Sequence, residues 1–241
     1  MRKVAVVTGG SRGIGRSVCL EAATRGYDVV FGYHSANEAA DTLVQEVEML
    51  GRTAVGVRAD LAQDEALQHL AGAARQLGPV SLLVNNAGVT NSGPFDSMTP
   101  SAWEQTLALN LTAPTCLSKA LAPDLKQVQG CIINIASTAA FTGSLHSVPY
   151  GVTKAGLLGL TKTLAGMLAP DVRVNAVCPG PIATELLDDS LSQTLLDQIL
   201  AATPLRRLGA PDEVATVVLD VASWRYCTGQ SVVVDGGRVM H

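Results

Sequence analysis

The chain has 241 residues, of which 47% are hydrophobic and 16% are charged, and it contains 23 glycines. This length and composition suit one large α/β domain with a buried parallel sheet and many tight turns. The formal net charge is −4 and no basic block is present, which argues against nucleic acid as the partner.

The sequence also limits the compartment. Its five cysteines are scattered without a C-x-x-C pair, so they predict small buried side chains in a reducing compartment and neither a disulfide nor a metal framework. Few apolar residues separate Lys3 from Thr8, and uncharged stretches contain Ser, Thr, His and Pro, so we expect neither a signal peptide nor a membrane span. We therefore expect a cytoplasmic protein with no metal and no membrane partner.

The first predicted unit is a strand, a glycine-rich turn and a helix. The β-branched run at 4–7 predicts the strand, and the helical pattern covers 16–25. A glycine-rich turn between them lets the backbone approach a pyrophosphate, which the helix N-terminus attracts. The spacing is G-x-x-x-G-x-G, but its position predicts nucleotide binding. The residues concerned are Gly9, Ser11, Arg12, Gly13, Ile14 and Gly15.

The end of the second predicted strand, 28–33, indicates which nucleotide. NAD enzymes often carry an acid there for the ribose hydroxyl, whereas this chain has Tyr33, His34 and Ser35. Arg12 could meet a 2′-phosphate, so the sequence favours NADP(H) over NAD(H). The alternative is that Arg12 and His34 are solvated loop residues.

A helix is predicted over 36–50 and a third strand over 53–57. Asp60 and Leu61 follow the strand and fit a contact to an adenine edge. Asp60 could instead cap the next predicted helix, 63–76.

The fourth predicted strand, 81–84, runs into the sequence Asn-Asn-Ala-Gly. Small residues there allow the close approach of a ligand, which makes Asn86, Ala87 and Gly88 candidates for cofactor contact. The asparagines could instead fix the turn.

A long helix is predicted over 101–119, and Asn110 lies in its apolar segment. A buried amide needs hydrogen-bond partners. Asn110 is therefore either a satisfied core residue or the holder of a water molecule.

The central stretch joins a fifth predicted strand, 131–135, to a helix that ends before Pro170. Ser137 follows the strand, and Tyr150 and Lys154 lie four residues apart on one face of the helix. An ammonium beside a phenol favours the phenolate, so Lys154 is expected to lower the Tyr150 pKa and to make Tyr150 a proton donor and acceptor. The alternative is an ordinary pair of helix residues.

The last third has a strand at 172–177, a helix at 211–223 and a strand at 231–234. Between them an amphipathic segment follows a strand's carboxyl end, where α/β sites are built, and predicts a substrate lid at about 184–204 or a plain surface helix. The alternation predicts one Rossmann-type α/β domain over 1–241. Its sheet is expected to be doubly wound, parallel and seven-stranded, with helices on both faces.

These motifs, in this order, resemble those of the classical short-chain dehydrogenase/reductase family over essentially the whole chain. Asn110, Ser137, Tyr150 and Lys154 match its catalytic tetrad residue by residue. The resemblance implies that Tyr150 exchanges a proton with the substrate oxygen and that Ser137 hydrogen-bonds that oxygen. Lys154 would hold the nicotinamide ribose and lower the Tyr150 pKa, while Asn110 would hold a water in a relay to Lys154.

The resemblance also implies further contacts to the cofactor. Besides Tyr150 and Lys154, these come from Pro179, Gly180, Ile182 and Thr184. A mostly apolar substrate pocket is expected from residues near the tetrad. They are Phe95, Ser137, Ala139, Phe141, Leu145, His146, Leu186 and Leu187.

The sequence thus predicts an NADP(H)-dependent oxidoreductase that interconverts a ketone and a secondary alcohol. A 3-oxoacyl-acyl-carrier-protein reductase acting on an acyl thioester is the alternative. Such enzymes place basic residues before the fifth and sixth strands, where this chain has Val-Gln-Gly at 128–130 and Ala-Pro-Asp at 169–171, although Lys126 and Arg173 are nearby. A third hypothesis, a catalytically silent cofactor sensor, would usually lack a tetrad residue, and none is missing.

Family resemblance suggests a homotetramer in which helices 101–119 and 150–168 form a four-helix interface. The second helix carries more leucines than one stripe against a sheet requires, and its glycines leave room for close approach. The alternative is that the surplus leucines pack within one chain.

Overall fold

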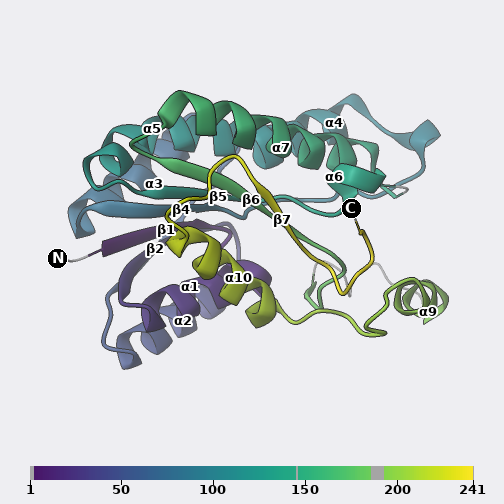
Figure 1. The fold of residues 1–241 in the computed structure, drawn as a ribbon, viewed down its shortest axis with the longest axis horizontal. Helices are drawn as coiled ribbons and strands as arrows, with labels where there is room; N and C mark the ends of the chain where they lie inside the picture. The colour runs from purple at the N-terminus through teal and green to yellow at the C-terminus, as the bar shows by residue number, and fades with distance from the viewer. Residues whose placement is uncertain (1–2, 145, 186–192, 241) are drawn as a thin grey trace.

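The computed structural model describes residues 3–144, 146–185 and 193–240. Within these ranges the strands form one parallel seven-stranded sheet in the order β3-β2-β1-β4-β5-β6-β7, which confirms the predicted α/β fold (Figure 1). The order reverses between β1 and β4, at the position where open α/β sheets bind ligands. The strands are β1 (Lys3–Thr8), β2 (Tyr27–Tyr33), β3 (Ala54–Arg58), β4 (Val80–Asn85), β5 (Cys131–Ile135), β6 (Arg173–Pro179) and β7 (Ser231–Val234).

Helices cover both faces of this sheet, with α1, α2 and α10 on one side and α3, α5 and α7 on the other (Figure 1). Helix α9 lies away from the sheet and has no buried residue. The helices are α1 (Gly13–Thr24), α2 (Asn37–Met49), α3 (Asp64–Leu77), α4 (Pro100–Leu107), α5 (Ala113–Gln127), α6 (Ala139–Thr142), α7 (Val148–Leu168), α9 (Gln193–Ala201) and α10 (Pro211–Ser223).

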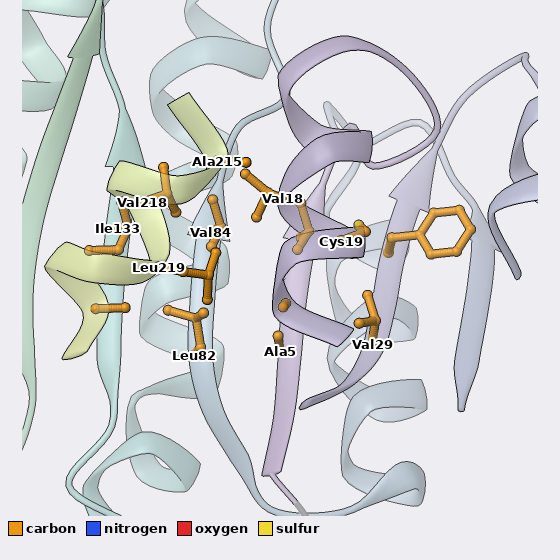
Figure 2. Close-up of a cluster of buried hydrophobic side chains, with 14 of the residues drawn as sticks. Ala5, Val18, Cys19, Val29, Leu82, Val84, Ile133, Ala215, Val218 and Leu219 are labelled. Carbon is orange, nitrogen blue, oxygen red and sulfur yellow. The ribbon is translucent and has the colours of Figure 1, made fainter. Parts of the chain in front are cut away.

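The core beneath α1 and α10 forms because these helices present apolar side chains to strands that are buried on both faces. Figure 2 shows Val18 and Cys19 of α1 and Val218 and Leu219 of α10 pointing toward the strands. All four side chains are at most 2% exposed. Burial of each large aliphatic side chain stabilises the fold by about 1.5–3 kcal/mol.

The second core lies on the opposite face of the sheet. Alternate residues of β1, Val4 and Val6, point into it, and the same buried cluster contains Leu117, Leu121 and Leu125 of α5. Because α5 is held in this way, the segment that precedes it is fixed over the carboxyl end of β4.

The predicted helix over 101–119 is present, but it is interrupted by a π turn and extends to Gln127. The chain forms α4, then a π-helical turn at Ala108–Thr112, and then α5. The π turn contains Asn110. Its buried side chain forms hydrogen bonds with the backbone of Val89, in the loop after β4. Single π turns inside helices are frequent at functional sites.

Most other bounds agree with prediction to within one or two residues. Strand β6 extends to Pro179 because it pairs with β7 up to Val234. Helix α7 begins at Val148, since Ser147 serves as its N-cap and accepts a hydrogen bond from the Tyr150 N–H at 3.3 Å. Of the predicted lid, the structure describes Thr184, Glu185 and α9, so the lid as a whole stays a prediction.

None of the helices in the described part of the chain is long and apolar enough to cross a membrane. Among the same residues no group of three His, Cys, Asp or Glu side chains is placed to hold a metal ion.

Candidate active site

The glycine-rich turn after β1 is shaped by positions that only glycine tolerates. Gly9 and Gly13 have φ values of +66° and +52°, in the left-handed region. A Cβ on Gly15 would lie 2.1 Å from the Gly9 carbonyl oxygen. The turn therefore packs tightly against the start of α1 and leaves its backbone bare toward the sheet's carboxyl edge, a cradle that fits a dinucleotide pyrophosphate.

Hydrogen bonds fix this turn to the segment after β4. The Thr8 hydroxyl accepts the N–H groups of Asn86 and Ala87, each at 2.9 Å. The Asn86 amide donates to the carbonyls of Thr8 at 2.9 Å and Gly9 at 3.2 Å. The Asn86 side chain thus fixes the glycine-rich turn after β1, and its contact with a cofactor stays a prediction.

Ser137 and Tyr150 meet at the carboxyl end of β5. The Ser137 hydroxyl lies close enough to the Tyr150 phenol to lower its pKa, and the Ser137 Oγ accepts the Ala139 N–H at 3.1 Å. The Lys154 ammonium lies 5.5 Å from the centre of the Tyr150 ring. The structure therefore places three members of the predicted tetrad together.

Lys154 is almost fully buried, with 5% of its surface exposed, and its Nζ donates to the Ile135 carbonyl at 2.7 Å. Burial lowers the pKa of Lys154 to about 8, and the neighbouring Cys178 thiol partly opposes this change. The predicted direction for Tyr150 is wrong: burial raises its pKa, and the Ser137 hydrogen bond opposes the rise. The reason is that burial disfavours the charged phenolate more than the neighbouring groups favour it, while the Lys154 ammonium donates to a carbonyl of β5.

Asn110 lies behind the other three residues and is fully buried. Its Oδ1 accepts the Val89 N–H at 2.9 Å, and its Nδ2 donates to the Val89 carbonyl at 2.9 Å and to Thr153 Oγ1 at 3.2 Å. Its side chain is thus satisfied within the chain, and a relay water stays a prediction. A Cβ on Gly88 would lie 3.2 Å from Asn110 Oδ1 and 3.7 Å from Lys154 Nζ, so this glycine leaves the space between them open.

The adenosine end of the candidate site is exposed. Arg12 begins α1 and forms an ion pair with Glu185 at 3.5 Å, with more than half of each side chain exposed. The carbonyl of His34 accepts a hydrogen bond from the Nε of Arg58 at 3.2 Å. Arg58 was not predicted from the sequence, because the only local signal was its position at the end of a strand.

Asp60 and Leu61 serve the fold in this structure. The Asp60 carboxylate accepts the Ala62 N–H at 3.1 Å, which stabilises the turn before α3. Leu61 is 5% exposed and packs over Gly32. Contact with an adenine ring stays a prediction for both.

The nicotinamide end of the predicted site is built by the segment after β6. The Pro179 carbonyl accepts the Thr138 N–H at 2.9 Å, which holds this segment beside Ser137. Gly180 packs so closely on Asp235 that a Cβ would lie 2.6 Å from the Asp235 Cβ. Thr184 reaches the glycine-rich turn, with its Cγ2 3.2 Å from a Cβ built on Gly13. The remaining predicted contacts in these segments are Ser11 and Ile182, which are buried, and Ile14, Tyr33 and Ser35, which are partly or fully exposed.

The predicted substrate pocket is described in part. Ala139 and Phe141 lie on α6, and the His146 carbonyl accepts the Gly93 N–H at 2.9 Å, which ties the loop after β4 to the start of α7. A cavity between that loop and α7 is lined by uncharged residues, including the expected Phe95, but by none of the tetrad. Leu145, Leu186 and Leu187 lie outside the described residues.

The fold and this arrangement define a class of nicotinamide-dependent oxidoreductases. The family model for short chain dehydrogenase matches residues 3–194, and the chain belongs to this family. It is 38% identical to the 3-oxoacyl-[acyl-carrier-protein] reductase FabG of Staphylococcus epidermidis over 245 residues, an alignment that covers 100% of both chains. It is 40% identical to the 3-oxoacyl-[acyl-carrier-protein] reductase of Synechocystis sp. over 244 residues, covering 99% of this chain and 97% of the relative.

Among solved structures, a blue fluorescent protein from a metagenomic library, in complex with NADPH, superposes with a TM-score of 0.93. It shares 37% sequence identity, and the match covers 99% of this chain and 98% of that protein. The family and fold predicted from the sequence are thereby confirmed.

Proposed function

We propose that this protein is an NADP(H)-dependent ketoreductase that interconverts a ketone and a secondary alcohol. The observation that carries the proposal is the placement of the Ser137 and Tyr150 hydroxyls together, beside the buried Lys154. The pair lies at the carboxyl edge of the same sheet that holds the glycine-rich turn. Two hydroxyls at one point can hold a carbonyl oxygen, and one of them can transfer a proton to it.

The cofactor would be held along this edge. The bare backbone around Gly9, Gly13 and Gly15 fits the pyrophosphate, with Thr184 packed against Gly13, and Lys154 beside Gly88 would hold the nicotinamide ribose. When bound, the nicotinamide supplies or accepts the hydride. All other steps fall to the side chains of this protein.

In the direction of reduction, Tyr150 would donate the proton from its Oη to the substrate oxygen. Its raised pKa keeps the phenol protonated near neutral pH, which is the form required of the acid. Ser137 would hold the same oxygen while negative charge develops on it. In oxidation the same groups would receive the proton in reverse.

Lys154 and Asn110 would act from behind these hydroxyls. A Lys154 pKa of about 8 leaves most of its ammonium charged at neutral pH, and that charge stabilises a phenolate formed at Tyr150 after proton transfer. Asn110 anchors the loop after β4 to α7 and so positions Lys154, and the predicted relay water would lie beside Gly88.

The preference for NADP(H) rests on charge. No acid stands at the end of β2, where Tyr33, His34 and Ser35 are found, and Arg12 lies at the start of α1. The NADPH complex of the metagenomic relative, at 37% identity, supports the same choice.

Reduction of a 3-oxoacyl thioester is the second candidate activity. Its support is the name of the two curated relatives, which match this chain over nearly their whole length. An electrostatic observation weighs against a protein carrier. The nearby Arg173 guanidinium is turned inward and donates to the carbonyls of Ala222 at 2.6 Å and Trp224 at 2.8 Å. Both terminal nitrogens of this guanidinium are therefore committed to the protein's own backbone, which limits its hydrogen bonds to a carrier protein.

Turnover of NADPH with a substrate panel tests the proposal. The panel contains free ketones, 3-oxoacyl thioesters of coenzyme A and the same acyl groups on a carrier protein. Turnover of any member supports a ketoreductase, and a strong preference for the carrier-bound form selects the second activity. Tight binding of NADPH without turnover of any substrate would instead identify a catalytically silent sensor.

We further propose a cytoplasmic homotetramer, assembled through α4, α5 and α7, and a single domain with a lid at 184–204. Val152 and Met167 of α7 are 47% and 72% exposed, and Gly159 and Gly166 have open space above them, as an unpartnered helix face would. The alternative was that the surplus leucines of this helix pack within one chain. Several of them do so, namely Leu157, Leu158, Leu160, Leu164 and Leu168. Light scattering measures the mass in solution and so distinguishes a tetramer from a monomer, whose mass is 25.0 kDa.

A further inference from the structure

Arg58 lies at the adenosine end of the site, where no function was predicted for it. It is the last residue of β3 and pairs in register with Tyr33, the last residue of β2. The Ala59 N–H donates to the Tyr33 carbonyl at 2.8 Å, which keeps the two strand ends together. Arg58 is thus held next to the turn that follows β2, where dinucleotide enzymes place the adenosine ribose.

The bonding of Arg58 leaves part of its guanidinium available. Its Nε donates to the His34 carbonyl at 3.2 Å, and the side chain is otherwise exposed in an open hollow. The carboxylates of Asp60 and Glu65 line the same hollow. Within the described ranges, however, no carboxylate forms an ion pair with Arg58.

The two arginines at the start of α1 differ in this respect. Arg12 pairs with Glu185 at 3.5 Å, and Arg16 pairs with Glu46 of α2 at 2.5 Å. Each therefore shares its charge with a carboxylate of this chain. Arg58 bonds to a neutral carbonyl instead, so its full positive charge remains for a ligand.

We infer that Arg58 is a specificity-determining residue for NADPH, which meets the 2′-phosphate and fixes the turn at 33–35 that receives it. The inference rests on the proposed use of NADP(H). A guanidinium has five N–H donors in a planar fork, so one nitrogen can hold the His34 carbonyl while the others bind phosphate oxygens. Hydrogen bonds between charged groups of this kind are shorter and stronger than neutral ones.

The variant Arg58→Ala tests the inference, with Arg52→Ala as its matched control. Arg52 lies two residues before β3, at the amino ends of the strands, whereas Arg58 lies at their carboxyl ends. The Arg52 Nη1 donates to the Gly26 carbonyl at 3.1 Å. Both variants remove one positive charge from an arginine that donates to a backbone carbonyl, Arg58 being exposed and Arg52 half-buried. Binding is measured by calorimetry for NADPH, NADH, adenosine 2′,5′-bisphosphate and adenosine 5′-monophosphate.

For Arg58→Ala we expect NADPH and the bisphosphate to bind about tenfold more weakly, with NADH and the monophosphate changed less than about twofold, because only the first two carry the 2′-phosphate. Arg52→Ala should change none of the four. Arg58→Lys should keep most of the preference for NADPH, since it keeps the charge. Added salt should weaken NADPH binding less in Arg58→Ala than in the wild type.

An equal loss for all four ligands would show a purely structural role for Arg58, and unchanged binding of NADPH would overturn the inference altogether. Failure of the proposed function looks different, because the wild-type protein would then neither prefer NADPH nor turn it over. Thermal unfolding of both variants identifies any that has lost its fold.

Discussion

The two ends of the candidate site differ in how far their polar and charged side chains are exposed to water. At the chemical end, Lys154 and Asn110 are buried and their polar groups bond to atoms of the protein at 2.7–3.2 Å. At the adenosine end, Arg12 and Arg58 are exposed to solvent and make single contacts of 3.5 and 3.2 Å. Electrostatic interactions are strong where water is excluded and are screened where it is not.

The comparison teaches that changes at the two ends should differ in size and in kind. A side chain in the buried end should affect turnover or stability strongly and independently of salt. A side chain at the exposed end should affect the choice of cofactor modestly and in a salt-dependent way.

The largest effect is expected from Tyr150→Phe. The ring remains, so packing survives, but the hydroxyl beside Ser137 is lost together with its proton. Turnover of NADPH should fall about 10²–10⁴-fold, while NADPH binding stays nearly unchanged. Tyr226→Phe is the control, since Tyr226 is fully exposed. Retention of more than about a tenth of wild-type turnover would exclude Tyr150 as the proton donor.

Lys154→Met should change how stability depends on pH. The folded pKa of Lys154 is about 8, below its ordinary value of 10.5, so between these values the unfolded state binds more protons than the folded state. Stability from this group therefore rises with pH across the window, by up to about 1.4 kcal/mol per pH unit, and the variant should lack that rise.

Denaturant unfolding at several pH values measures the slope. The raised pKa of Tyr150 acts in the opposite direction, because it removes stability as the pH rises above 10, and it is present in both proteins. Lys162→Met, on the exposed side of the same helix, is the control and should behave as the wild type. Identical slopes in the wild type and in Lys154→Met would mean that Lys154 is not held in a desolvated site.

Arg12→Ala should have a smaller effect, on the choice of cofactor. We expect NADPH to bind about fivefold more weakly and NADH to change little, because only NADPH carries the 2′-phosphate and the Arg12 side chain is more than half exposed. Titration of protein fluorescence with each cofactor measures the ratio. Equal losses for both cofactors would contradict the assignment.

The smallest effect is expected from Glu185→Gln. The variant removes the carboxylate that shares the charge of Arg12, so NADPH should bind more tightly, by less than about twofold, with NADH unaffected. Low salt should enlarge the difference. Glu213→Gln breaks a surface ion pair with Arg207 and is the control. Weaker binding of NADPH in Glu185→Gln would show that this glutamate supports the cofactor rather than competing with it.

The sequence by itself determined the parts of this protein that depend on local patterns. Apolar runs gave the strands 131–135 and 231–234 and the helix 211–223 with their observed bounds. Glycine spacing located the turn after β1, and the resemblance carried by Ser137, Tyr150 and Lys154 predicted residues that the fold brings together. Such signals are readable because side-chain period and turn chemistry act between close neighbours in the chain.

Only the tertiary structure decided the features that depend on distant partners. The π turn around Asn110 interrupts a continuous helical pattern because the amide bonds to Val89, on another segment. The Tyr150 pKa is raised rather than lowered because burial is a property of the whole packed edge, and because Lys154 finds a carbonyl on β5. The contacts of Arg58 with His34 and of Arg12 with Glu185 join residues that are far apart in sequence, and no local pattern specifies which surface charges meet when parallel strands end at one edge.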